Sequence, residues 1–174
     1  FNEGFATLVE REGVLRWLQG ESNHAALDAW WTTQDRELSF VALLMQTRKR
    51  LGKIYQLPLT DQQKRSRKAD EFRLLSEEYQ NLKALWGGFD GYDAWFEHEP
   101  NNARLASVAT YEQWVPAFRL LLVRAGGEME EFYQACDRLA QLPAAQRREE
   151  MESLQEAALE AGLDNWSTAG DVSY

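Results

Sequence analysis

Apolar residues recur every three or four positions along almost the whole chain, and this spacing constrains the fold more than any other feature. Between residues 72 and 86 the steps are 3, 4, 3 and 4 residues, which places these side chains on one face of a helix. No stretch of useful length alternates apolar and polar residues, as a half-buried strand does. The sequence therefore predicts an all-α fold, with one helical domain over residues 1–161 and a loose tail over 162–174.

Capping residues and helix breakers predict where the long helices begin and end. We expect a first helix with Gly20 as its C-cap, and a second helix that starts after Ser22 as N-cap and stops before Pro58. Thr60 and Gln63 have the spacing of a capping box, which predicts the start of a third helix. Because the link between these helices is short, they should form a long antiparallel hairpin.

The chain between 87 and 110 is rich in glycine, asparagine and aromatic residues, so it is predicted to be loop-rich with short helical turns. Further helices are expected over about 114–124, 128–142 and 143–161. The tail that follows is expected to be loose or held by Trp166. Cys136, the single cysteine, lies at helical spacing from Phe132 and Leu139 and is predicted to be buried rather than reactive.

Charge and hydropathy exclude several classes of protein. The 174 residues include 19 basic and 28 acidic side chains, and a net charge of −9 argues against binding to nucleic acid. The longest mostly apolar run, 40–45, is far shorter than the roughly 20 residues of a membrane span. Four basic residues cluster within 62–70, and we interpret them as a solvated helix face, with a partner or an anionic surface as the alternative.

The first six residues show the start of a helix and one acidic side chain of interest. Asn2 can cap the helix, and Glu3 is favourable at the positive end of the helix dipole. Gly4 lowers helix stability, and a residue without a side chain would let another group approach the backbone closely. From the residues alone, Glu3 is more simply a solvated or structural acid than a ligand.

The phrase Asn2-Glu3-Gly4-Phe5-Ala6 resembles the segment that carries the third zinc ligand in gluzincin aminopeptidases. The longer run FNEGFATLVEREGVLRWL and the later blocks 86–96 and 101–118 resemble successive parts of a bacterial family of predicted aminopeptidases, as far as about residue 142. The resemblance implies that this chain corresponds to the C-terminal portion of such an enzyme, downstream of its His-Glu-x-x-His helix. It also implies that Glu3 binds Zn²⁺, and that the protein resides in the bacterial periplasm or as a lipoprotein at the cell envelope.

The sequence departs from this family pattern because it contains no His-Glu-x-x-His motif. Its two histidines are His24 and His98, and Pro100 would break the helix that the motif needs. Catalytic zinc takes three protein ligands. We therefore expect no zinc in this chain by itself and no activity, whereas the full-length protein should bind Zn²⁺ and hydrolyse peptide bonds with zinc-activated water.

Three further residues are candidates by the same resemblance. Tyr111 is the candidate hydrogen-bond donor to the oxyanion, or else it packs at the start of the next helix. Asn101 and Asn102 are candidate substrate-binding residues, or else they form a turn.

Two other interpretations of the chain remain open. The chain could be a non-catalytic interaction or regulatory domain that uses the hairpin over 30–86. A chain without the zinc helix could also self-associate through a first-helix face that bears Phe1, Phe5 and Leu8.

Overall fold

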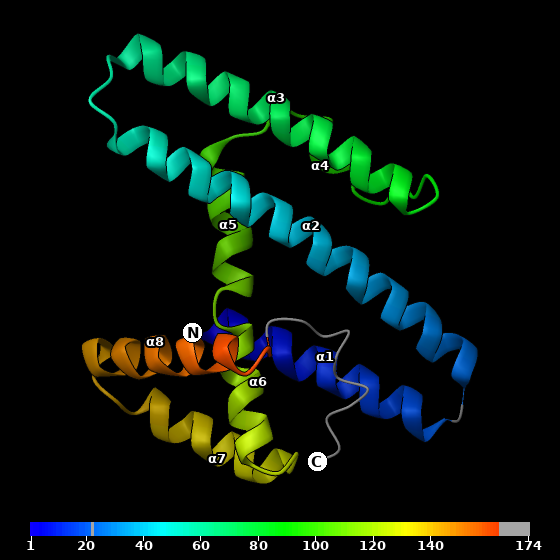
Figure 1. Cartoon of the computed structure of the whole chain (residues 1–174). Coiled ribbons are helices and arrows are strands. Elements are labelled where there is room, and N and C mark those ends of the chain that lie inside the picture. Colours follow the sequence, from blue (N-terminus) through cyan, green and yellow to red (C-terminus); the bar gives the residue numbers. More distant parts are fainter. Residues whose placement is uncertain (22, 164–174) are drawn as a thin grey trace. The chain divides into compact units, whose positions relative to one another are not determined.

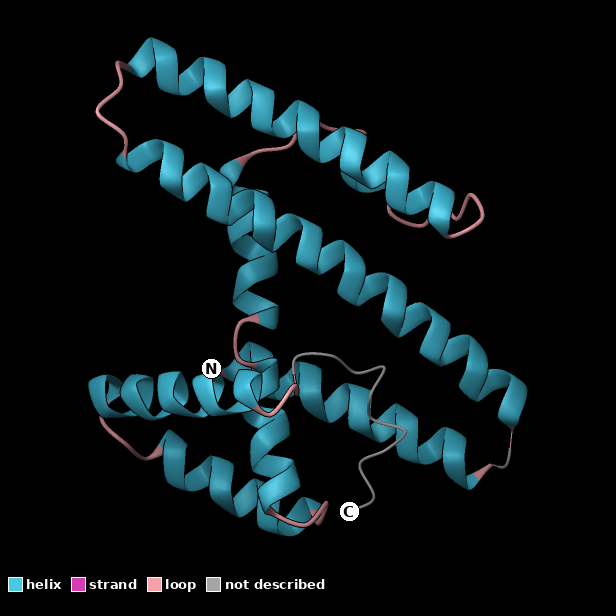
Figure 2. Ribbon diagram, in the orientation of Figure 1, coloured by secondary structure: helices cyan, strands magenta, loops and turns pink. Residues whose placement is uncertain are grey.

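The computed structural model describes residues 1–21 and 23–163, which form helices and no strand (Figure 2). The predicted all-α class is thereby confirmed. The chain divides into two compact units. Unit 1 consists of Phe1–Asp35 and the chain from Thr110 onward, and unit 2 is Arg36–Ala109. The single domain expected over 1–161 stays a prediction, and Ser22, Trp166 and nearly all of the expected loose tail lie outside the described residues.

Helix α6, Val115–Arg124, is the central element of unit 1. It contacts α1 (Asn2–Gly20), α7 (Met129–Ala140) and α8 (Ala144–Glu160). Its sequence is apolar almost all round, which is the pattern of a helix that is buried on every side. Pro116 stands in its first turn, as predicted, where a missing N–H costs no helical hydrogen bond. Six of its residues are buried: Val115, Ala117, Phe118, Arg119, Leu120 and Leu122.

The apolar face of α1 is covered within unit 1. Leu8 is fully buried, and the rings of Phe1 and Phe5 lie edge-on to Phe118 at centroid distances of 5.1 and 5.9 Å. Phe5 also stacks on Phe132 at 5.9 Å. Leu8 is thus not part of an exposed patch, because α6 and α7 cover this face, whereas Phe1 and Phe5 stay partly exposed. Self-association through this face stays a prediction.

Unit 2 is built on a hairpin of α2 (His24–Gln56), which belongs to this unit from Arg36 onward, and α3 (Asp61–Leu85). The two helices run antiparallel and are joined by a short link (Figure 1). The predicted capping box is present, since Thr60 and Gln63 exchange side-chain and backbone hydrogen bonds. The short helix α4 (Asp93–Phe96) and the beginning of α5 (Asn102–Glu112) complete the unit. The core of unit 2 contains Phe40, Leu43, Leu44, Leu51, Ile54, Phe72, Leu75, Tyr79 and Leu105.

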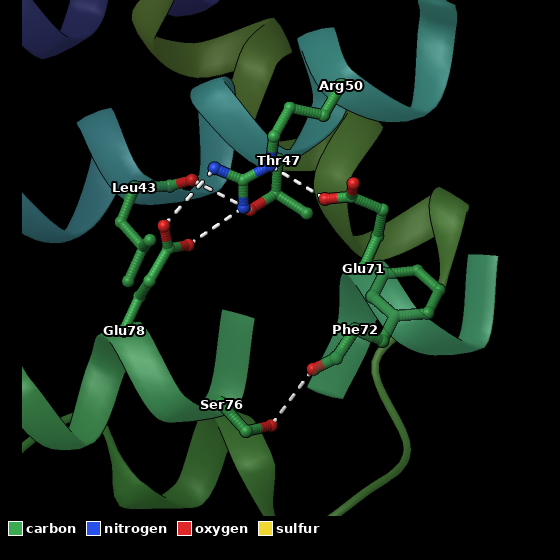
Figure 3. A network of polar contacts seen from close by, with 7 residues as sticks. All are labelled: Leu43, Thr47, Arg50, Glu71, Phe72, Ser76 and Glu78. Atoms are coloured by element: carbon green, nitrogen blue, oxygen red, sulfur yellow. Dashed lines mark hydrogen bonds and ion pairs between the residues drawn. The ribbon is translucent and has the colours of Figure 1, made fainter. Parts of the chain in front are cut away.

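One arginine joins the two helices of the hairpin (Figure 3). Arg50 Nε donates to Glu71 Oε2 at 2.7 Å, and its Nη2 donates to Glu78 Oε2 at 2.8 Å. Nη2 also donates to the hydroxyl of the fully buried Thr47. Desolvation opposes the charge of the guanidinium, but the hydrogen bonds to Glu78 and Glu71 outweigh it and raise the pKa of Arg50 above its ordinary value. These bonds fix which turns of α2 and α3 face each other.

A second polar cluster ties α3 to α4. The buried Tyr79 hydroxyl donates to Asp93 Oδ1 at 2.6 Å, and Lys83 bonds the other carboxylate oxygen. Hydrogen bonds from Lys83 and Tyr79 hold the pKa of Asp93 below its ordinary value. Burial is also confirmed for Cys136, whose thiol pKa rises to about 12 because the charged form would be desolvated.

Three local predictions need correction or replacement. Gly20 is the last residue of α1 rather than its cap, since Glu21 follows in an ordinary right-handed conformation with φ −76°. Asn23 caps the N-terminus of α2, since its Oδ1 accepts a hydrogen bond from the backbone N–H of Ala26 at 3.1 Å. The region expected to be loop-rich holds the helix α5, because the side chain of Asn101 caps it and Leu105 and Ala109 give it a buried face.

Candidate functional site

Glu3 lies in the first turn of α1 with its side chain exposed to solvent. Its backbone carbonyl accepts a hydrogen bond from Thr7 Oγ1 at 3.0 Å, but its carboxylate makes no hydrogen bond or ion pair with any described residue. The negative charge is favourable there, since the N-terminal N–H groups of a helix carry partial positive charge. Glu3 is thus an accessible carboxylate that no other described side chain engages.

The residue after Glu3 is held tightly against the rest of unit 1. Gly4 is buried, and a Cβ built on it would lie 3.0 Å from Trp114 Cβ and 3.4 Å from the Trp114 carbonyl carbon. Glycine therefore allows α1 to approach the residue that precedes α6 at a distance at which a larger residue would force Trp114 to shift by a few tenths of an ångström. The prediction that a residue without a side chain beside Glu3 admits a close neighbour is confirmed, and Trp114 is that neighbour.

A buried ion pair joins α1 to the end of α5 within unit 1. Arg11 Nη2 donates to Glu112 Oε1 at 2.9 Å and Nη1 donates to Oε2 at 3.2 Å, so the pair is bidentate. The two side chains are only 6% and 14% exposed. Sequence reasoning missed this pair, although there was a signal. Arg11 continues the apolar spacing of Leu8, Leu15 and Leu18, and a charge in an apolar stripe indicates a buried partner.

Tyr111 precedes Glu112 and also belongs to unit 1. Tyr111 is 49% exposed, which leaves its hydroxyl role and the packing alternative both as predictions. The contacts of Gly4 with Trp114 and of Arg11 with Glu112 hold the segment that carries Tyr111 against the helix that carries Glu3. The structure therefore brings together the elements that bear these two candidates.

The other two candidates belong to unit 2 and have partners there. Asn101 Oδ1 accepts the backbone N–H of Arg104 at 3.1 Å, which is the turn-forming role that the sequence left open. The amide of Asn102 bonds the hydroxyl of Tyr55 through Oδ1 at 3.2 Å and through Nδ2 at 3.0 Å. Both asparagine side chains are exposed, but neither is without a partner.

Asn102 and Tyr55 line a groove of about 860 Å³ in unit 2. The groove lies between the second half of α2 and the first turns of α5. Apolar atoms dominate its surface, with contributions from Met45, Leu51 and Leu105. Arg48 and Lys49 are the charged residues that line it.

The described residues do not form a complete metal site. No group of three or more His, Cys, Asp or Glu side chains comes together among them. His24 and His98 are exposed and belong to different units. Because catalytic zinc needs three protein ligands, residues 1–21 and 23–163 supply at most part of such a site.

Comparison with known families decides what kind of protein this is. Residues 1–151 match the family model described as "Putative aminopeptidase". The chain belongs to this family. The match includes Glu3, Tyr111 and both asparagines. Neither the curated proteins nor the solved structures that were compared gave a match. No helix in the described part of this aminopeptidase-family chain is long and apolar enough to cross a membrane.

Gly4 and Gly13, both inside α1, provide a matched test of the close approach at Gly4. Gly13 is exposed with no atom near its Cβ position, so Gly13→Ala should stabilise the protein by about 0.5–1 kcal/mol. Gly4→Ala gains the same helix propensity but meets Trp114, and should be less stable than Gly13→Ala by about 1 kcal/mol or more. Chemical denaturation measures both. Equal stabilisation by the two substitutions would show that α1 does not approach Trp114 closely.

The Arg11–Glu112 pair can be tested against an exposed pair of the same type. Glu112→Gln leaves the buried guanidinium of Arg11 without its counter-charge and should lower the free energy of unfolding by about 2–4 kcal/mol. Glu152→Gln removes the partner of Arg148 in a pair that is 72% and 59% exposed, and should cost at most about 0.5 kcal/mol. Urea denaturation gives both values, and similar costs for the two variants would contradict the structural role of Glu112.

Proposed function

We propose that this chain is part of a zinc-dependent aminopeptidase and that Glu3 is one of the zinc ligands of the complete enzyme. The observation that carries the proposal is the carboxylate of Glu3, which is accessible and has no partner although its neighbour Gly4 is fixed by packing. A ligand on a rigid element holds its geometry better than one on a loop. Membership of the aminopeptidase family supports the same assignment.

The remaining ligands would come from a His-Glu-x-x-His helix outside these 174 residues, since the sequence has two histidines and not in that spacing. The chemistry that zinc supplies in such a site is activation of water for hydrolysis of a peptide bond. The contribution of this chain is one carboxylate oxygen, held by a helix whose first turn packs on Trp114.

Tyr111 is proposed to donate a hydrogen bond from its hydroxyl to the carbonyl oxygen of the substrate as negative charge develops there. Two features support this role: its side chain is accessible, and Arg11 fixes the adjacent Glu112 against the helix of Glu3. Asn101 and Asn102 are further proposed to bind substrate. For this, the side-chain amide of Asn101 must break its hydrogen bond with the backbone N–H of Arg104, and that of Asn102 must break its hydrogen bonds with the Tyr55 hydroxyl.

The ligand assignment can be tested by zinc analysis of the full-length gene product. The unaltered protein should contain one zinc per chain, and Glu3→Gln should lose most of it because a neutral amide is a weaker zinc ligand than a carboxylate. Glu10→Gln is the matched control, since Glu10 is an exposed acid on the same helix. Full zinc retention in Glu3→Gln would remove Glu3 from the ligand set.

Hydrolysis of aminoacyl-arylamides by the same proteins tests the role of Tyr111. Tyr111→Phe should keep its zinc but lower kcat by about 10²–10³-fold, since it removes one hydrogen bond made to the transition state. An unchanged kcat would exclude Tyr111 from catalysis. A full-length protein with neither zinc nor hydrolytic activity would instead favour the alternative function, a helical interaction domain.

A further inference from the structure

The closed end of the α2–α3 hairpin concentrates positive charge in a chain whose net charge is −9. Residues 48–68, which form the end of α2, the link and the start of α3, contain a single acidic residue, Asp61. They contain eight basic residues: Arg48, Lys49, Arg50, Lys53, Lys64, Arg65, Arg67 and Lys68. The distribution is more one-sided than a solvated helix face requires, because such faces normally mix both signs.

Almost none of this charge is neutralised within the chain. Arg50 is paired with Glu71 and Glu78. Lys64 donates to the backbone oxygen of Tyr55, and Lys68 lies 5.5 Å from the centroid of the Phe72 ring. The other five basic residues of the segment form no ion pair with a described residue. The hairpin end therefore presents seven basic side chains whose counter-charges lie outside the fold.

Apolar side chains are exposed at the same place. The link Leu57–Thr60 is the turn at which the hairpin closes (Figure 1). Leu57 in this link is 40% exposed, and Tyr55 in the last turn of α2 is 39% exposed. A leucine and a tyrosine flanked by lysines and arginines are the residue types that enter the interfacial layer of a membrane.

We propose that the closed end of the hairpin, residues 48–68, binds the surface of a membrane that contains anionic phospholipids. The seven cations that have no acidic partner within the fold face the phosphate groups, and Leu57 with Tyr55 enters the headgroup layer. A nucleic acid or an acidic polypeptide would satisfy the charges but would leave the exposed leucine without a role. The proposal does not depend on the aminopeptidase activity. Arg48, Lys49 and Tyr55 also line the groove beside Asn102, so the variants that test the proposal are placed at Arg65, Arg67 and Leu57, which do not line it.

Vesicle co-sedimentation with the whole protein tests this. The protein should bind vesicles of phosphatidylcholine mixed with phosphatidylglycerol, should not bind vesicles of phosphatidylcholine alone, and should dissociate as salt is raised. Each cation near an anionic surface strengthens binding by about fivefold. The double variant Arg65→Glu/Arg67→Glu should therefore bind at least about 25-fold more weakly.

Two further variants show whether binding depends on the hairpin end itself or only on the net charge of the protein. Arg124→Glu/Arg138→Glu makes the same change of net charge with exposed arginines of unit 1, and should bind like the unaltered protein. Binding that persists at high salt comes from the apolar side chains, because salt screens the attraction between charges. Leu57→Ser should weaken this remaining binding. Circular dichroism checks that every variant keeps its helices.

Several results would overturn the proposal. It fails if the unaltered protein does not bind the mixed vesicles, or if the unit 1 variant loses as much binding as Arg65→Glu/Arg67→Glu. It also fails if single-stranded RNA or poly-glutamate binds more tightly than the vesicles and depends on the same two arginines, since the partner is then a different macromolecule.

Discussion

The burial of α6 on all sides determines how unit 1 is arranged, and with it the position of Glu3. Phe118 of α6 receives the rings of Phe1 and Phe5, and Trp114, which caps α6, contacts Gly4. The first turn of α1 is therefore fixed on both sides of Glu3 by apolar contacts, while the carboxylate itself points to no partner. If α6 were amphipathic rather than apolar all round, α1 would have no such support.

Several acidic residues elsewhere in the chain are used differently from Glu3. Glu112, Glu71 and Glu78 each pair with an arginine that joins two helices, and Asp93 receives hydrogen bonds from Lys83 and Tyr79. These carboxylates hold the fold together. Glu3 has no such partner, and the adjacent Gly4 packs on Trp114, so its carboxylate is held on a fixed element and is accessible to a ligand.

Local signals predicted the local structure well. The capping box at Thr60, the first-turn position of Pro116 and the burial of Cys136 follow from residues a few positions apart, and all are present. The helix α5 was missed because the glycines and aromatic residues before it resemble a loop, although Leu105 and Ala109 already have helical spacing.

Contacts between distant residues could not be predicted in the same way. Arg11 and Glu112 are 101 positions apart, and nothing near either residue specifies the other. The covering of the α1 face by α6 and α7 is likewise a property of packing, which is why an exposed patch was expected there. The family phrase located Glu3, but only the structure shows that its carboxylate has no partner and that Gly4 beside it packs closely on Trp114.

The most direct test of the central claim is anomalous diffraction at the zinc edge from crystals of the full-length gene product. The account predicts a single strong peak with a carboxylate oxygen of Glu3 about 2.0–2.2 Å from it. A zinc peak that is coordinated entirely by other residues, with Glu3 still facing solvent, would contradict it.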